Sequence, residues 1–239
     1  MSKRGKKYRE NSEILEEKAY KVTEAVDKLK EMKSSKFDET VEVSMRLGVD
    51  PKYPEQMVRG TIVLPHGTGK TKKVLVLASG EKQKEAEESG ADFFGGEELV
   101  EKIKKENWLD FDVLVATPDM MREVGKLGKV LGPKGLMPSP KAGTVTFNIK
   151  ETVIEIKKGR IEFRVDKTGI INAGVGKISF DNSKIVENII AFVNAVLKAK
   201  PVSLKGKYVI SVHASSTMSP SVKLDIQEYE KGSGGKSDQ

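Results

Sequence analysis

The sequence predicts a mixed α/β protein in which an α/β module is inserted into an α+β module. In the middle of the chain, unalternated apolar runs at 74–78 and 112–118 are interspersed with charged helical patterns. Such runs are typical of a parallel sheet that helices cover on both faces. Both chain ends carry alternating strands and amphipathic helices instead. We expect the crossings between the modules near 67–71 and 157–160, where glycine and charge interrupt the pattern.

These observations set the expected domain boundaries. Residues 1–68 and 160–230 would form one discontinuous α+β domain, and residues 69–159 would form the inserted α/β domain. The polar, glycine-containing tail at 231–239 is expected to be disordered.

The first part of the outer module is predicted to be one helix and two strands. Apolar residues recur at helical spacing over 11–33, with Asn11 and Ser12 as candidate caps. Residues 40–47 alternate apolar and polar side chains, which is typical of a half-buried strand. A second strand over 57–64 is expected to pair with it antiparallel.

Patterns in the rest of the chain predict the remaining elements. We expect helices over 81–89, 97–107 and 119–131, an irregular loop over 132–143, strands over 144–149, 152–156 and 160–165, a long helix over 181–200, and closing strands over 208–214 and 222–226. Asp181 or Ser183 is the candidate cap of the long helix.

Composition excludes several classes of protein. The 239 residues contain no cysteine and two histidines, so neither a thiolate nucleophile nor a histidine-rich metal site is expected. No apolar stretch approaches the roughly 20 residues that a membrane-spanning helix requires. The basic N-terminus leads into a charged helical pattern, which is not that of a secretory signal. We therefore expect a cytoplasmic protein without cofactor, metal or membrane partner.

The charge distribution favours a nucleic-acid partner. The formal net charge is +7, of which residues 69–159 carry +1 and the two flanking segments carry +6. The N-terminal arm contributes five basic residues, which would bind phosphates without reading bases: Lys3, Arg4, Lys6, Lys7 and Arg9. No signature of an RNP or KH domain is present.

A nucleotide-binding enzyme is the main alternative. The segment HGTGKT at 66–71 ends like a phosphate-binding loop, but Leu64 stands where such a loop needs glycine, and a strand pattern follows. His66 and His213 are interpreted as a loop residue and a strand residue. A DNA-binding regulator would need a recognition helix, whereas the two long helices are amphipathic and face a core.

Three polar clusters in the outer module are the candidate site. The segment 35–40 places Phe37 between a lysine and two acids, where its ring could join the core or stack on a base. The segment 166–180 holds three glycines and two lysines, and 215–220 offers hydroxyl groups and an exposed methionine in a turn. Their occurrence together in the positively charged module favours binding.

Several segments resemble one known family. LGKVLGPKGLMPSPKAGTV at 127–145 closely resembles the signature segment of the large-subunit ribosomal protein L-one family, in its bacterial form. KFDETVEV (36–43), DKTGIINAGVGKISF (166–180), the helix ending in LKAKP (197–201) and SSTMSPSVKLD (215–225) resemble the family in the same order.

The resemblance implies a two-domain fold with a Rossmann-like insertion, a monomer when free, and no catalysis. It also implies that the protein belongs to the large ribosomal subunit and binds ribosomal RNA at the mobile stalk near the exit site. There it would help to release deacylated transfer RNA, and it would also repress translation of its own messenger RNA. The RNA-binding positions that it implies are Lys36, Phe37, Thr40, Glu42, Asp166, Lys167, Gly169, Ser211, Thr217, Met218 and Ser219.

One of these positions departs from the family pattern. The family has Ser-Thr-Met-Gly-Pro where this chain has Ser219 in place of the glycine. Glycine tolerates a positive φ, which costs other residues about 1 kcal/mol. We expect Ser219 either to adopt that conformation at this cost or to shift the turn.

Overall fold

The computed structural model describes residues 5–204 and 206–227. The chain divides into two compact units. We call Met1–Gly69 together with Ile161–Gln239 the outer unit, and Lys70–Arg160 the inner unit. The expected tail at 231–239, and Lys3 and Arg4 of the basic arm, lie outside the described residues.

A four-stranded antiparallel sheet organises the outer unit, with strand order β7-β1-β8-β9. Two further strands, β2 and β6, pair with each other. The elements are α1 (Lys6–Glu13), α2 (Val22–Glu31), β1 (Thr40–Leu47), η1 (Pro54–Gln56), β2 (Arg59–Val63), β6 (Arg160–Arg164), β7 (Ile170–Lys177), α8 (Asn182–Lys198), β8 (Val209–Ser216) and β9 (Val222–Leu224).

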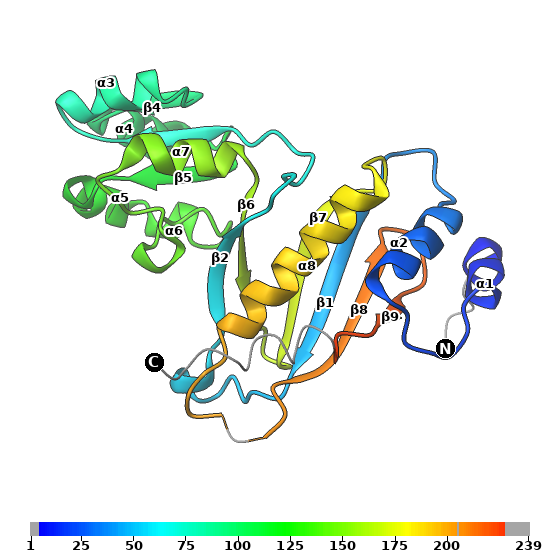
Figure 1. Ribbon diagram of the computed structural model, residues 1–239. Helices are drawn as coiled ribbons and strands as arrows, with labels where there is room; N and C mark the ends of the chain where they lie inside the picture. Colours follow the sequence, from blue (N-terminus) through cyan, green and yellow to red (C-terminus); the bar gives the residue numbers. More distant parts are fainter. Residues whose placement is uncertain (1–4, 205, 228–239) are drawn as a thin grey trace. The chain divides into compact units, whose positions relative to one another are not determined.

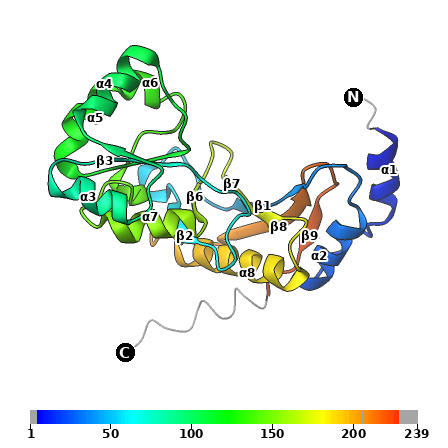
Figure 2. The same ribbon diagram turned by 90° about the horizontal axis from the view of Figure 1, so that it is seen from above.

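Helices α2 and α8 cover one face of this sheet and leave the other face open (Figures 1 and 2). The alternation of β1 predicts this arrangement, because Val41, Val43, Met45 and Leu47 all point into the core beneath the helices. Burying each such side chain contributes about 1.5–3 kcal/mol. The polar side chains between them therefore face away from the helices.

Helix α8 confirms the prediction of a long amphipathic helix. Ile185, Ile189, Phe192 and Val196 recur every three or four residues and are all buried. Asp181 is the N-cap residue, although its side chain makes no capping hydrogen bond. The ring of Phe192 packs edge-on against Phe163 of β6, with ring centroids 5.8 Å apart.

The prediction of one helix over 11–33 is wrong, because two separate helices, α1 and α2, flank an extended segment. Tyr20 interrupts the helix by forming a β-bridge to β9: its amide donates to Lys223, and its carbonyl oxygen accepts from Asp225. Asn11 and Ser12 lie inside α1, where neither can cap a helix start.

The predicted pairing of the strand at 57–64 with the strand at 40–47 is also wrong. β7 and β8 flank β1 on its two sides, so no edge of β1 is left for β2. β2 pairs instead with β6, and the amide of Val165 donates to the carbonyl oxygen of Val58 beyond the ends of this pair.

The inner unit is a three-stranded parallel sheet, in the order β4-β3-β5, between two layers of helices (Figure 1). Its elements are β3 (Val74–Leu77), α3 (Glu81–Glu88), β4 (Phe93–Gly95), α4 (Glu97–Glu106), β5 (Val113–Ala116), η2 (Pro118–Met120), α5 (Met121–Lys126), α6 (Gly128–Leu131), η3 (Pro140–Ala142) and α7 (Ile149–Lys157). Helices α4, α5 and α6 pack on one face, and α3 and α7 pack on the other. Both faces of β3 are buried, which explains its unbroken apolar sequence.

The strand predicted over 144–149 is reduced to a single parallel β-bridge between Val145 and Ala116 of β5, and the strand predicted over 152–156 is not formed. Residues 149–157 form the helix α7, in which Ile149, Val153 and Ile156 are buried at helical spacing. Short apolar runs of this kind do not distinguish a strand from a helix. In the part of the chain that the structure describes, no helix is long and apolar enough to cross a membrane.

Candidate nucleic-acid interface

The open face of the four-stranded sheet is a polar surface. In β1, Glu42 lies opposite Ser215, Ser44 lies opposite His213, and Arg46 lies opposite Ser211. None of these side chains is buried. Because side chains alternate between the two faces of a strand, the open face carries rows of hydroxyl, carboxylate, imidazole and guanidinium groups.

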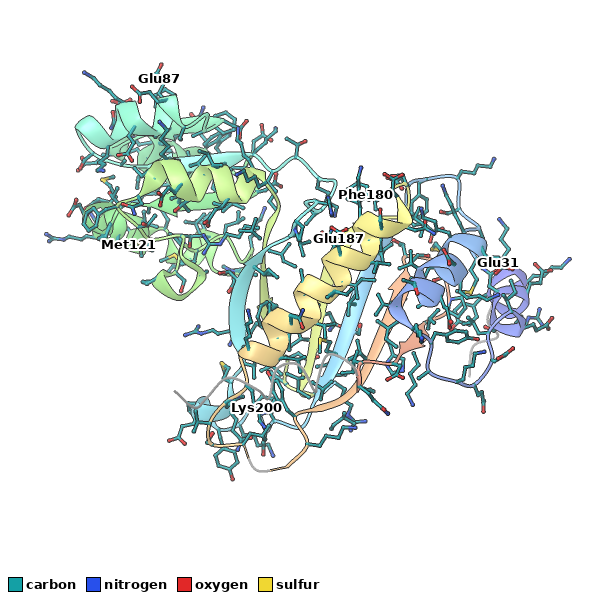
Figure 3. All side chains as sticks on the ribbon, in the orientation of Figure 1. Glu31, Glu87, Met121, Phe180, Glu187 and Lys200 are labelled. Atoms are coloured by element: carbon teal, nitrogen blue, oxygen red, sulfur yellow. The ribbon has the colours of Figure 1, made fainter. Side chains whose placement is uncertain are left out.

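β1 divides the candidate residues between two ends of the sheet, which we call the Thr40 end and the Leu47 end. The strand has eight residues, so the two ends are about 23 Å apart at the usual rise per residue. Phe180, just before α8, marks the Thr40 end in Figure 3, and Lys200, just after α8, marks the Leu47 end.

At the Thr40 end, the buried side chain of Glu39 joins two loops that are far apart in sequence. Its Oε1 accepts hydrogen bonds from the amide and the hydroxyl of Ser35. Its Oε2 accepts from the hydroxyl of Ser216 and, at 3.3 Å, from the amide of Met218. The side chain is fully buried, with 0% exposure. One carboxylate therefore fixes the 35–39 loop against the 216–218 turn.

Further hydrogen bonds bring a third segment to the same place. The amide of Thr40 donates to Oγ1 of Thr217 over 3.0 Å. Lys177, at the end of β7, donates to the carbonyl oxygen of Asp38 and to Oγ1 of Thr40, both over 3.1 Å. Ser179 donates from its hydroxyl to the carboxylate of Asp38 over 2.9 Å. The Thr40 end is thus assembled from three segments.

Two large apolar side chains project from this end into solvent. Phe37 is 52% exposed and Met218 is 56% exposed. Of the two alternatives for Phe37, burial in the core is therefore wrong, whereas stacking on a base stays a prediction. Lys36 is exposed beside it.

Ser219 does not adopt a positive φ, so of the two alternatives for this residue that one is wrong. Asn107 is the one non-glycine residue with a positive φ in the described part of the chain. Oγ of Ser219 accepts a hydrogen bond from the amide of Ser216 over 2.9 Å, and its own amide donates to the carbonyl oxygen of Ser216. The serine therefore closes the turn and is half-buried.

Four further candidate residues lie at the Leu47 end. Oδ1 of Asp166 accepts from the amides of Thr168 and Ile170, over 2.7 and 2.9 Å, and so shapes its own turn. Gly169 has a φ of +80°, and a Cβ there would lie 3.3 Å from the carbonyl oxygens of Leu47 and Val49. Only glycine fits this turn without strain.

Lys167 and Ser211 complete the Leu47 end. Lys167 is exposed in the turn, and Ser211 faces Arg46 on the open sheet. The structure thus brings Lys36, Phe37, Thr40, Thr217, Met218 and Ser219 together at one end and places Asp166, Lys167, Gly169 and Ser211 at the other, with Glu42 on the face between them.

Three titratable groups of the candidate interface have lowered pKa values. Burial raises the pKa of Glu39, but its hydrogen bonds with Ser216, Ser35 and Met218 outweigh burial, so the pKa is lowered overall. Hydrogen bonds from Thr168 and Ile170 lower the pKa of Asp166. Burial and, to a lesser degree, the charge of Lys223 lower the pKa of His213. The imidazole is therefore neutral at physiological pH.

Sequence analysis missed Glu39, Lys177 and Ser216 as members of the site. Glu39 lies in the polar segment 35–40 that the sequence singles out, but its partner Ser216 is 177 positions away. No local sequence pattern indicates such a pair.

The segment resembling a phosphate-binding loop has a structural explanation. Strand β3, and not a helix, follows it, so the helix N-terminus that holds a phosphate is missing. The buried side chain of Asn188 accepts from the amide of His66 and donates to the carbonyl oxygen of Gly67. Nε2 of His66 lies 2.6 Å from the carboxylate of Glu187 on α8, labelled in Figure 3. These contacts fix the chain as it leaves the outer unit.

Within residues 5–204 and 206–227, no group of three or more His, Asp and Glu side chains is placed to hold a metal ion.

Comparisons with known proteins identify close relatives. Residues 29–220 match the model of the family described as ribosomal protein L1p/L10e. The chain is 60% identical to the large ribosomal subunit protein uL1 of Solibacter usitatus, over 95% of this chain and 96% of the relative. It is 59% identical to the protein of the same name from Persephonella marina, over 95% of each.

Proposed function

Since the chain belongs to the ribosomal protein L1p/L10e family, a family of structural proteins and not of enzymes, we propose that it is a constituent of the large ribosomal subunit that binds ribosomal RNA. The RNA-binding surface is the open face of the outer unit's sheet, together with the Thr40 end and the Leu47 end.

The observation that carries this proposal is the construction of the Thr40 end. A buried carboxylate and the Thr40–Thr217 hydrogen bond hold an exposed phenylalanine and an exposed methionine in loops beside hydroxyl and amide groups. Unpaired bases stack on exposed rings, and hydroxyl groups and main-chain amides bind sugars and phosphates. The net charge of +6 in the flanking segments supplies the sequence-independent attraction.

Two further roles belong to the same proposal. The protein holds the mobile stalk near the exit site and assists the release of deacylated transfer RNA. When in excess, it represses translation of its own messenger RNA. Both roles rest on the resemblance of the site segments to the family.

We also propose that the two units are separate domains. Each has its own hydrophobic core, and the chain passes between them twice. All the proposed RNA-binding residues lie in the outer unit, and the inner unit is the Rossmann-like insertion.

A filter-binding experiment with purified large-subunit ribosomal RNA tests the proposal. We expect the logarithm of the affinity to fall linearly with the logarithm of the salt concentration, and duplex DNA to compete poorly. Affinity that does not change with salt, or equally strong competition by duplex DNA, would contradict it. Tight binding of a mononucleotide would instead favour the nucleotide-binding alternative.

A further inference from the structure

Helix α1 is held against the Thr40 end and is not a loose extension of the chain. The side-chain amide of Asn11 donates to the carbonyl oxygen of Met32 over 2.7 Å, and Nζ of Lys7 donates to that of Ser34 over 3.0 Å. Both acceptors lie in the segment that leads into Glu39 and β1. The helix therefore keeps a defined place beside the proposed RNA site.

A cavity of about 550 Å³ separates α1 from the 216–218 turn. It is lined by Gly5, Lys6, Lys7, Tyr8, Ser34 and Met218. Its volume lies within the roughly 300–1,000 Å³ of sites that take small organic groups. Its lining combines an aromatic ring, a thioether and two ammonium groups, of which that of Lys6 lies 3.8 Å from the carboxylate of Glu10 on α1.

We propose that this cavity is a second RNA subsite, which receives one unpaired nucleotide of the RNA bound at the Thr40 end. The inference rests on the proposed function. Tyr8 and Met218 contact the base of this nucleotide, and Lys6 and Lys7 bind the phosphate of the same nucleotide. Met218 belongs to both the turn and the cavity, so the subsite continues the interface directly.

The chemistry of the lining favours a nucleotide over an apolar peptide. A nucleotide offers the flat π-face of its base to the tyrosine ring and its anionic phosphate to the lysines, so both parts of the cavity are used. An apolar peptide would supply no anion to either ammonium group: Lys6 has an exposed carboxylate, that of Glu10, 3.8 Å away, and Lys7 donates to a carbonyl oxygen. Lys7 keeps further N–H donors beyond the one bound to Ser34, because an ammonium group has three.

Substitutions of Tyr8 separate stacking from simple charge attraction. Tyr8→Phe keeps the ring, whereas Tyr8→Leu keeps an apolar side chain for packing but removes the π-face. With large-subunit ribosomal RNA as the probe, we expect Tyr8→Phe to bind like the unchanged protein and Tyr8→Leu to bind roughly 10- to 100-fold more weakly. The slope of affinity against salt should stay the same in both variants, because no charge is lost.

The double variant Lys6→Ala, Lys7→Ala is the complementary test. It should lower that slope by about 0.7–0.9 for each phosphate contact removed. Ultraviolet crosslinking followed by mass spectrometry should also find a nucleotide attached to Tyr8 in the unchanged protein. Circular dichroism of each variant checks that α1 is still folded.

The outcomes distinguish this inference from the proposed function. If the unchanged protein fails to bind ribosomal RNA, the proposed function is wrong. If it binds, but Tyr8→Leu binds equally well and no crosslink forms at Tyr8, the subsite is wrong while the proposed function stands. Equal weakening of Tyr8→Phe and Tyr8→Leu would likewise overturn the stacking role.

Discussion

Replacing Glu39 by glutamine should separate the two loops of the Thr40 end. Each carboxylate oxygen accepts from one backbone amide, which cannot rotate: Oε1 from Ser35, and Oε2 from Met218. The side-chain amide of glutamine has one oxygen and one NH₂ group. In either orientation its NH₂ group therefore faces a backbone N–H, and one loop loses its acceptor.

The magnitude follows from the burial of this group. Glu39 is fully buried, and hydrogen bonds to charged groups contribute about 1.5–3 kcal/mol each. One such bond is lost and an unpaired amide remains, so we expect Glu39→Gln to lower the free energy of unfolding by about 2–4 kcal/mol. The displaced loop carries Phe37 or Met218, so affinity for ribosomal RNA should fall at least about tenfold.

Denaturant unfolding and filter binding measure the two effects. Glu162→Gln, at an exposed site on β6, is the matched control because it makes the same change of charge. Removing a negative charge by itself strengthens binding to RNA, so weaker binding by Glu39→Gln cannot arise from charge. Wild-type stability and affinity in Glu39→Gln would refute the proposed positioning role.

The pH dependence gives an independent check on Glu39. Its pKa in the folded protein is below the ordinary value of 4.5. The carboxylate therefore stabilises the folded state fully above about pH 4.5, and this contribution is lost as the pH falls through the lowered pKa. The difference in free energy of unfolding between the unchanged protein and Glu39→Gln should shrink in that range. A difference that does not change with pH would contradict the pKa shift.

Three other variants test the interface and the division of the chain. Thr217→Ala removes the acceptor of the Thr40 amide. With the fold intact, it should weaken specific RNA binding by about 1–3 kcal/mol in filter binding. Lys6→Ala should instead weaken binding to all RNAs alike. Joining Gly67 to Arg160 by a short Gly/Ser linker removes the inner unit and should leave a protein that melts cooperatively and keeps most of its RNA affinity. A folded product that does not bind RNA would place RNA contacts in the inner unit. Asn188→Ala removes buried hydrogen bonds to the segment at 66–67. It should lower the free energy of unfolding, measured by denaturant titration, by about 2–4 kcal/mol. An unchanged free energy of unfolding would show that these bonds do not stabilise the fold.

Local periodicity predicted those elements whose form depends on their own sequence. The alternation over 40–47 and the helical spacing within α8 each reflect a single buried face, so both appear in a short window of residues. Two of the three parallel strands of the inner unit, β3 and β5, follow likewise from unbroken apolar runs.

The wrong predictions concern segments whose structure depends on distant residues. The helical pattern near Tyr20 is interrupted because its backbone bonds to β9, which only the folded chain brings near. Likewise, β2 is a strand as its sequence indicates, but its partner β6 follows the whole inner unit. Pairing of this kind is set by the topology of the fold.

The candidate site shows the same division. The sequence placed Phe37 and Met218 in polar loops but did not show that one buried acid connects those loops. Glu39 looked like one more member of a charged cluster, since burial is not visible in composition. One of its three partners, Ser35, lies four residues before it, and the other two, Ser216 and Met218, come from the far end of the chain.

The burial of Glu39 also bears on why the loops are built around a charge. A buried carboxylate is costly unless every donor around it is in place, whereas an apolar side chain would tolerate many loop arrangements. The carboxylate therefore favours one arrangement, in which the amides of Ser35 and Met218 both face it. Loops held in the binding conformation lose less entropy when RNA binds, so more of the contact energy appears as affinity. On this argument, Glu39 contributes to RNA binding without touching the RNA, through the placement of Phe37 and Met218.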